Sequence, residues 1–127
     1  MGTFRTTIEL AAGVDGPFES IDALVDSGAT YTLLPSALLE QLGVQRSRTR
    51  SFVIADGGVH ELDMGLAWIR LRGEASPSWV VFGPDSAELL LGAVTLEEFT
   101  LGIDPARGEL VPINGYLVGL TALDTGS

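Results

Sequence analysis

The sequence contains no cysteine, no lysine and only one histidine, His60. The absence of cysteine excludes disulfides, thiol catalysis and thiolate metal sites. Nucleophilic catalysis assisted by histidine would depend on His60 alone, and this residue is more typical of an exposed polar position on a strand. No group of His, Asp and Glu residues has the spacing of metal ligands, so no metal and no other cofactor is expected.

Positive charge is also scarce, because seven arginines stand against 17 acidic residues and give a net charge of −10. This balance argues against binding to nucleic acid or to an anionic membrane surface, since both depend on basic residues. No apolar run approaches the ~18–20 residues of a membrane span. No apolar segment typical of a signal peptide follows the N-terminus. We therefore expect a cytoplasmic protein with no membrane or nucleic-acid partner.

The sequence does contain enough apolar material for one folded domain. It has 127 residues, of which 46% are hydrophobic and 19% are charged. No linker, charge block or low-complexity tract divides it. We expect residues 1–127 to form a single domain, with a core in about residues 3–113. Residues 114–127 are not placed by any pattern.

Short apolar runs separated by turns predict a mainly β protein. Residues 3–10 alternate between apolar and polar side chains, as in a half-buried strand. About nine such strands are expected, the last a weak one over residues 116–123. A short helix is expected over residues 35–42, with Gly43 at its C-terminal end, and a marginal one over residues 94–99 capped by Thr95. The pattern favours a small, mostly antiparallel β-barrel or sandwich.

The middle of the sequence predicts a long hairpin around a tight turn at Asp56-Gly57-Gly58. This turn is expected to need positive φ angles, which glycine adopts without strain. The return strand, residues 59–72, changes its apolar face midway. Such a change indicates either a bulge or a strand that passes between two sheet environments. Arginine alternates with serine and threonine over residues 46–51, which we expect to be an exposed approach to the strand 52–54.

The most informative feature is a carboxylate in an apolar frame. The tripeptide Asp26-Ser27-Gly28 lies between the apolar runs 23–25 and 31–34. A carboxylate at such a place is costly unless its charge is hydrogen-bonded, shared or used. Gly28 would allow a sharp turn that presents N–H groups to the carboxylate. Taken alone, this pattern is equally consistent with a functional and with a structural aspartate.

Three motifs together resemble the retropepsin-like aspartic proteases, the single-lobed relatives of pepsin. The first is the active-site signature, here Asp26, Ser27, Gly28, Ala29 and Thr30. The second is a glycine-bearing hairpin at the place of the family's flap, with Ala55, Asp56, Gly57 and Gly58. The third is a hydrophobic-hydrophobic-glycine motif followed by a short helix, here Leu90, Leu91 and Gly92. The resemblance covers about residues 3–113.

This resemblance implies a small closed barrel with one or two short helices and an aspartic endopeptidase activity on peptide or protein substrates. Catalysis of this kind needs two carboxylates that share one proton and activate water. One chain supplies one good motif, so the resemblance implies a homodimer with Asp26 of each copy at the two-fold axis. Ser27 is implied to hydrogen-bond to the other copy's loop.

Some residues depart from the family pattern. Ala93 stands where viral members usually carry an arginine, and the helix over residues 35–42 resembles cellular and bacterial members. These departures leave open a non-catalytic dimerisation or peptide-binding module on the same barrel. A more distant alternative is a binding domain in which Asp26 is structural. A second Asp-Thr-Gly-Ser string at residues 124–127 has no apolar strand after it, so we expect a polar tail there.

Overall fold

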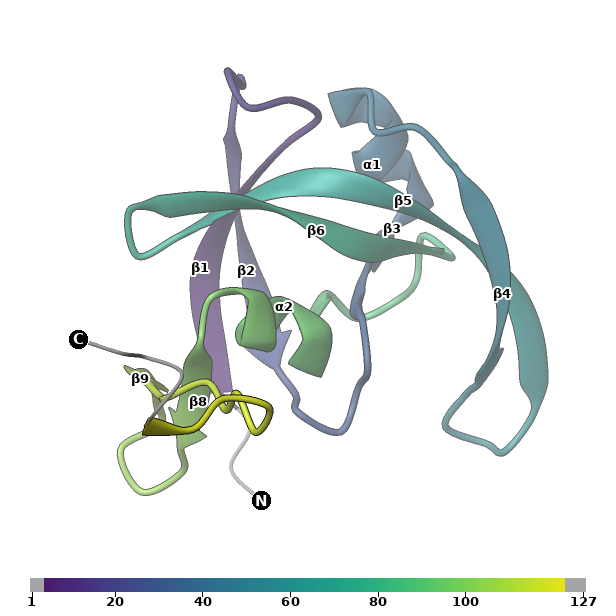
Figure 1. The fold of residues 1–127 in the computed structure, drawn as a ribbon. Coiled ribbons are helices and arrows are strands. Elements are labelled where there is room, and N and C mark those ends of the chain that lie inside the picture. Colours follow the sequence, from purple (N-terminus) through teal and green to yellow (C-terminus); the bar gives the residue numbers. More distant parts are fainter. Residues whose placement is uncertain (1–3, 123–127) are drawn as a thin grey trace.

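The computed structural model describes residues 4–122 of the protein. This part of the chain is mainly β, with two short helices (Figure 1). The strands are β1 (Phe4–Ala11), β2 (Glu19–Val25), β3 (Thr32–Pro35), β4 (Arg48–Val53), β5 (Val59–Leu71), β6 (Glu74–Gly83), β7 (Leu90–Leu91), β8 (Leu101–Asp104) and β9 (Glu109–Pro112). The helices are α1 (Ser36–Leu42) and α2 (Ala93–Glu98).

Seven of these strands form one sheet in the order β1-β2-β7-β3-β6-β5-β4. A further pairing of β1 with β5 brings the sheet back on itself, so that β4 is the only one of the seven outside the ring. The pairs β2–β7 and β3–β6 are parallel and the others antiparallel. The prediction of a mainly β fold is therefore confirmed. The weak last strand expected from residue 116 is wrong, since residues 116–122 form no strand.

The long strand β5 explains the change of apolar face seen in the sequence. Residues 59–64 pair with β4 and residues 64–71 pair with β6, in a register that continues without a bulge. The strand thus passes from an exposed hairpin into the barrel, where its odd-numbered residues are buried. At the crossing point the chain comes so close that a Cβ on Gly65 would lie 2.2 Å from the carbonyl oxygen of Gln45.

The two helices differ in how well their ends could be predicted. Helix α1 follows Pro35, buries Leu39 and ends at Gly43, whose φ of 91° is the left-handed conformation that glycine allows. Helix α2 begins and ends one residue earlier than expected, and Gly92 precedes its first residue. The expectation that Thr95 caps this helix is wrong, because Thr95 is buried inside the helix and hydrogen-bonds to other elements.

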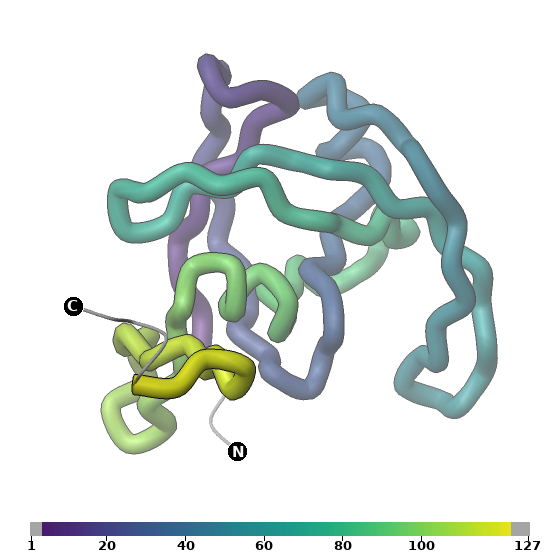
Figure 2. Tube along the Cα trace, viewed as in Figure 1, coloured from purple at the N-terminus to yellow at the C-terminus, as the bar shows by residue number. Residues whose placement is uncertain are grey.

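The loop that carries the Asp-Ser-Gly motif connects β2 to β3 at one end of the molecule. Figure 2 shows that this loop, the turn of the β4–β5 hairpin and the β8–β9 hairpin lie at the same end. Helix α2 packs behind the loop, against β3 and β6. The fold therefore gathers three turns around one end and supports one of them from behind with a helix.

Candidate active site

Asp26 directly follows β2 and lies half-buried in a tight turn. Its backbone N–H donates to the carbonyl oxygen of Leu91 over 3.1 Å, which holds the loop against β7. The N–H of Gly28 donates to Asp26 Oδ1 over 2.9 Å, and the N–H of Ala29 donates to the Asp26 carbonyl over 3.1 Å. These bonds fix both the turn and one oxygen of the carboxylate, as the sequence predicted for Gly28.

The start of α2 fastens the other side of this loop through the main chain. The N–H of Ala93 donates to the carbonyl of Ala29 over 2.8 Å, and the N–H of Val94 donates to the carbonyl of Thr30 over 2.9 Å. Gly92 is required for this approach, since a Cβ there would lie 2.4 Å from the carbonyl carbon of Tyr31. The tie between helix and loop therefore needs no side chain at position 93.

A buried chain of three hydroxyls lies behind the loop. Thr32 Oγ1 lies 2.6 Å from Thr95 Oγ1, which lies 2.9 Å from Ser78 Oγ. Thr32 Oγ1 also accepts the N–H of Gly92 over 3.1 Å. The chain joins β3, α2 and β6, and all three side chains are at most 2% exposed. Sequence reasoning missed this cluster, although a hydroxyl in each of three apolar segments was a visible signal.

The turn of the β4–β5 hairpin is exposed and closed by its own hydrogen bonds. The N–H of Ile54 donates to the carbonyl of Gly58, and the N–H of Gly57 donates to the carbonyl of Ile54, both over 2.9 Å. Asp56 Oδ1 accepts the N–H of Gly58 over 2.8 Å. Gly57 has a φ of 89°, whereas Gly58 does not lie in the left-handed region. The expected need for positive φ thus holds for Gly57 alone.

One face of the hairpin turns toward the Asp26 loop. The ring of Phe52 packs edge-on against the ring of Tyr31, with centroids 6.1 Å apart. Residues 46–51 are exposed as expected except Arg48, but the strand begins earlier than expected, because β4 starts at Arg48 and not at Phe52. The guanidinium of Arg48 lies over the ring of Trp79, 3.7 Å from its centroid. This side chain is half-buried as a result.

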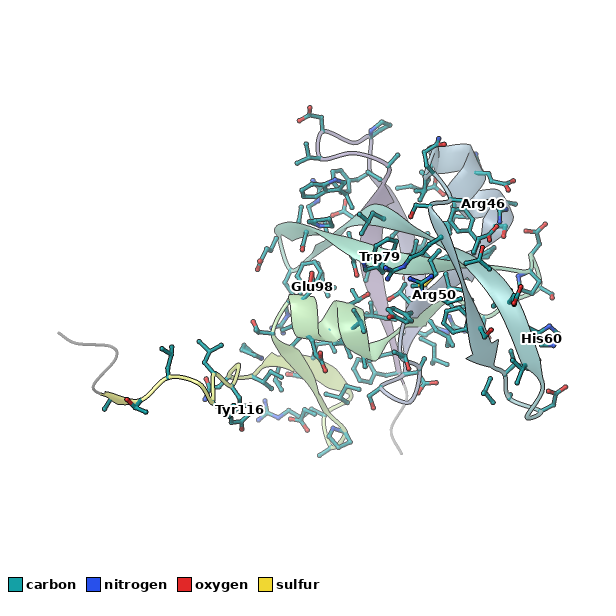
Figure 3. The ribbon with its side chains drawn as sticks, turned by 45° about the vertical axis from the view of Figure 1, so that its right-hand side comes forward. Arg46, Arg50, His60, Trp79, Glu98 and Tyr116 are labelled. Carbon is teal, nitrogen blue, oxygen red and sulfur yellow. The ribbon has the colours of Figure 1, made fainter. Side chains whose placement is uncertain are left out.

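The structure brings together two of the three predicted motifs. The N–H of Asp26 bonds to Leu91 of the Leu90-Leu91-Gly92 motif, and Ala29 and Thr30 accept bonds from the start of α2, directly after that motif. The turn at residues 55–58 makes no hydrogen bond to that loop within the described part of the chain. His60 is exposed on β5, at the outer edge of the hairpin (Figure 3). The string at residues 124–127 lies outside the described residues.

No other part of the described chain offers a comparable arrangement. A cavity of about 220 Å³ lies between β1, the end of β5 and β9, where Phe4, Leu71 and Leu110 line it, and it includes neither Asp26 nor the hairpin turn. Residues 4–122 hold no group of three His, Asp or Glu side chains that could bind a metal. Neither of the helices in this range is long and apolar enough to cross a bilayer.

Comparisons with known proteins show the family and the fold of the chain. The family described as "gag-polyprotein putative aspartyl protease" matches residues 11–98. The chain belongs to this retropepsin-like family. Two solved structures share the retropepsin-like fold at 20% identity and a TM-score of 0.55. They are the EIAV protease complexed with the inhibitor HBY-793 and the solution structure of the Simian Foamy Virus (mac) protease. Each match covers 76% of this chain, and 86% and 94% of those chains. The comparison with curated proteins found no match.

Proposed function

We propose that the protein is an aspartic endopeptidase, active as a homodimer in which Asp26 of each copy forms the catalytic pair. The observation that carries this proposal is the Asp26 loop. It presents one carboxylate at an end of the molecule and is held by main-chain bonds to β7 and α2. A single half-buried carboxylate cannot share a proton, so the mechanism needs a second copy to bring another. Residues 1–127 would form one protease domain, with its core in about residues 3–113.

The chemistry follows from the proximity of two equivalent carboxylates. Like charges about 3 Å apart cannot both ionise easily, so the pair holds one proton and titrates as a unit. The ionised member takes a proton from water as the water attacks the scissile carbonyl. The protonated member donates a hydrogen bond to the oxygen on which negative charge develops. No metal is required for this reaction.

Ser27 would fix the relative position of the two loops. Its side chain is exposed, and its hydroxyl has no hydrogen-bond partner among residues 4–122. A hydroxyl at that position can donate to a carbonyl of the partner's loop across the two-fold axis. Gly28, Ala29 and Thr30 then act as support, because their main-chain bonds keep the carboxylate in place.

The β4–β5 hairpin would serve as the flap over an extended peptide. Its turn, residues 55–58, stands at the same end of the molecule as the Asp26 loop (Figure 2). Three apolar side chains around the turn are exposed, namely Val53, Ile54 and Val59. These side chains would cover the substrate and exclude water when the hairpin closes. A peptide held between hairpin and loop would bind through strand-like main-chain bonds.

The proposal is tested by cleavage of a denatured-protein pool at acidic pH by the protein and two variants. Asp26→Asn removes the group that activates water, so we expect activity to fall by several orders of magnitude. The matched control, Asp124→Asn, changes charge equally and should keep activity within a few fold. A statine-type transition-state mimic should inhibit the unaltered protein. Full activity in a folded Asp26→Asn variant would overturn the proposal, and no cleavage by the unaltered dimer would favour a peptide-binding module.

A further inference from the structure

Three of the seven arginines form no ion pair within residues 4–122, and two of these three, Arg48 and Arg50, lie on the same strand, β4. Ion pairs with Asp or Glu engage Arg5, Arg46, Arg70 and Arg107. Arg72 donates to the carbonyl of Leu110. Arg48 and Arg50 have no acidic partner within residues 4–122. In a protein with a net charge of −10, these two residues form a local patch of the opposite sign.

Both arginines project from the face of the hairpin that turns toward the Asp26 loop. Alternate residues of a strand share a face, so Arg48, Arg50 and Phe52 lie together on β4. Phe52 packs against Tyr31, the residue that ends the Asp26 loop. Figure 3 shows Arg50 and Trp79 on the inner side of the hairpin, toward α2. A peptide lying between hairpin and loop would therefore pass this face.

The two guanidinium groups are held in place but incompletely bonded. The guanidinium of Arg48 lies over the ring of Trp79, and its buried Nε has no hydrogen-bond partner within the described residues. Stacking on an aromatic ring fixes the plane of a guanidinium while its N–H groups stay available. Arg50 is exposed and donates only to the carbonyl of its neighbour, Thr49. An ion pair inside the protein would have used these donors, as it does for Arg46.

We infer that Arg48 and Arg50 form a carboxylate-binding subsite, so that preferred substrates carry Asp or Glu beside the cleaved segment. This inference rests on the proposed protease function and names its substrate class. Planar guanidinium groups bind carboxylates through paired, charge-assisted hydrogen bonds. Two residues of a strand span about 6.8 Å, both in β4 and in an extended peptide. An extended peptide that runs along β4 would therefore bring alternate side chains past Arg48 and Arg50 at the same spacing as the two arginines.

A binding experiment tests the inference independently of catalysis. The Asp26→Asn dimer is titrated with fluorescein-labelled ten-residue peptides that have an apolar centre and a single Glu or Gln, scanned along both flanks. At one or more flanking positions we expect the Glu peptide to bind about ten-fold more tightly than its Gln counterpart at ~0.1 M salt. In the double variant that also carries Arg50→Gln, this ratio should fall toward one. Arg107→Gln, which removes the same charge from an exposed side chain on the β8–β9 turn, should preserve the ratio.

Cleavage by the protein with Asp26 intact then separates the two proposals. If it cleaves the peptides and the ratio of kcat/KM for Glu over Gln follows the binding ratio, both proposals hold. If it cleaves all peptides but shows no preference for Glu at any position, the subsite is wrong and the protease function stands. If the Glu preference appears in binding without any cleavage, the subsite stands and the protease function is wrong. A Glu preference that persists in Arg50→Gln and Arg48→Gln would overturn the assignment of these two residues.

Discussion

At the scale of single residues, the Asp26 loop is held mainly by main-chain N–H and carbonyl groups, whose bonds to one another no sequence motif predicts. The N–H groups of Ala93 and Val94 donate to the carbonyls of Ala29 and Thr30, so main-chain bonds join α2 to the loop. Behind them, the hydroxyl of Thr95 links the strand after the loop to β6. Buried hydroxyls are stable only when bonded, so the three members of this chain depend on one another.

Thr95→Val should therefore destabilise the fold more than its small change in volume suggests. It leaves the hydroxyls of Thr32 and Ser78 buried with one partner fewer. We expect a loss of about 1–3 kcal/mol in the free energy of unfolding, measured by urea denaturation. Thr95→Ser keeps the hydroxyl and should lose less. Equal stability of Thr95→Val and the unaltered protein would show that this chain contributes nothing to the support of the loop.

The carboxylate of Asp63 on β5 accepts hydrogen bonds from Thr49 on β4 and from Arg46, just before β4. Acid weakens these bonds when it protonates the carboxylate. Hydrogen bonds from Thr49 and then from Arg46 hold the pKa of the Asp63 carboxyl below the usual range. Because this pKa is lower in the folded than in the unfolded state, the ionised carboxylate contributes to stability. The contribution is complete at pH values above the unfolded pKa of about 3.9. This contribution is lost as the pH falls through the lower folded value.

Thr49→Val should accordingly raise the pKa of Asp63 toward its ordinary value, because it removes the bond with the largest effect. The pKa is measured by NMR titration of the carboxyl carbon. Thr7→Val removes a similar bond to Asp22 on the opposite side of the molecule and serves as the control. An unchanged pKa of Asp63 in Thr49→Val would contradict the assignment of this hydrogen bond.

At the scale of elements, the proposed flap and the β5–β6 turn form a natural comparison. Gly57 in the first has a φ of 89° and Gly73 in the second a φ of 81°, and a Cβ would meet no atom within 4 Å at either position. Valine would therefore fit in space at both turns but strain the backbone to a similar extent. Only the first turn lies at the end of the molecule that carries Asp26 (Figure 1).

We expect Gly57→Val to lower kcat/KM several-fold, because a strained turn disfavours the closed hairpin, while Gly73→Val leaves kcat/KM nearly unchanged. Both variants should lose similar stability in thermal unfolding. Cleavage of one peptide by the two purified variants gives the comparison. Equal activities would mean that the β4–β5 hairpin does not act as a flap.

The sequence predicted most elements because their signals are local. Alternation identified β1, and Gly43 marked the end of α1. It could not predict that β4 begins at Arg48, since a row of arginines resembles an exposed segment until Trp79 is brought beneath it. The strand expected from residue 116 was predicted from apolar content alone. The sequence does not show whether a partner strand is available, and residues 116–122 form no strand.

The candidate site was predicted to a similar degree. The family resemblance implies that the Leu90-Leu91-Gly92 motif lies near the site, and in the structure the Leu91 carbonyl accepts the N–H of Asp26. The role of Thr95 was misjudged, because a threonine near a helix start resembles a cap when the residues packed around it are unknown. What the sequence could not predict, for the fold and for the site, depends on contacts between segments that lie far apart in the chain.

At the scale of the whole molecule, charge opposes the association that the mechanism needs. Each chain carries −10, so two chains carry −20. Repulsion of this kind acts over a Debye length of about 10 Å at 0.1 M salt and weakens as salt is added or carboxylates are protonated. Assays of the dimer are therefore best made at acidic pH with added salt.

The most direct test of a catalytic pair shared between two copies is a mixing experiment under these conditions. The unaltered protein and Asp26→Asn are denatured together in equal amounts, refolded and assayed at constant total protein. If both Asp26 side chains of a dimer are needed, only about one quarter of the dimers are active, and peptide cleavage should fall to about one quarter of that of the unaltered protein. Cleavage that falls only to about one half, in proportion to the unaltered chains present, would show that each chain acts alone and would contradict the shared pair.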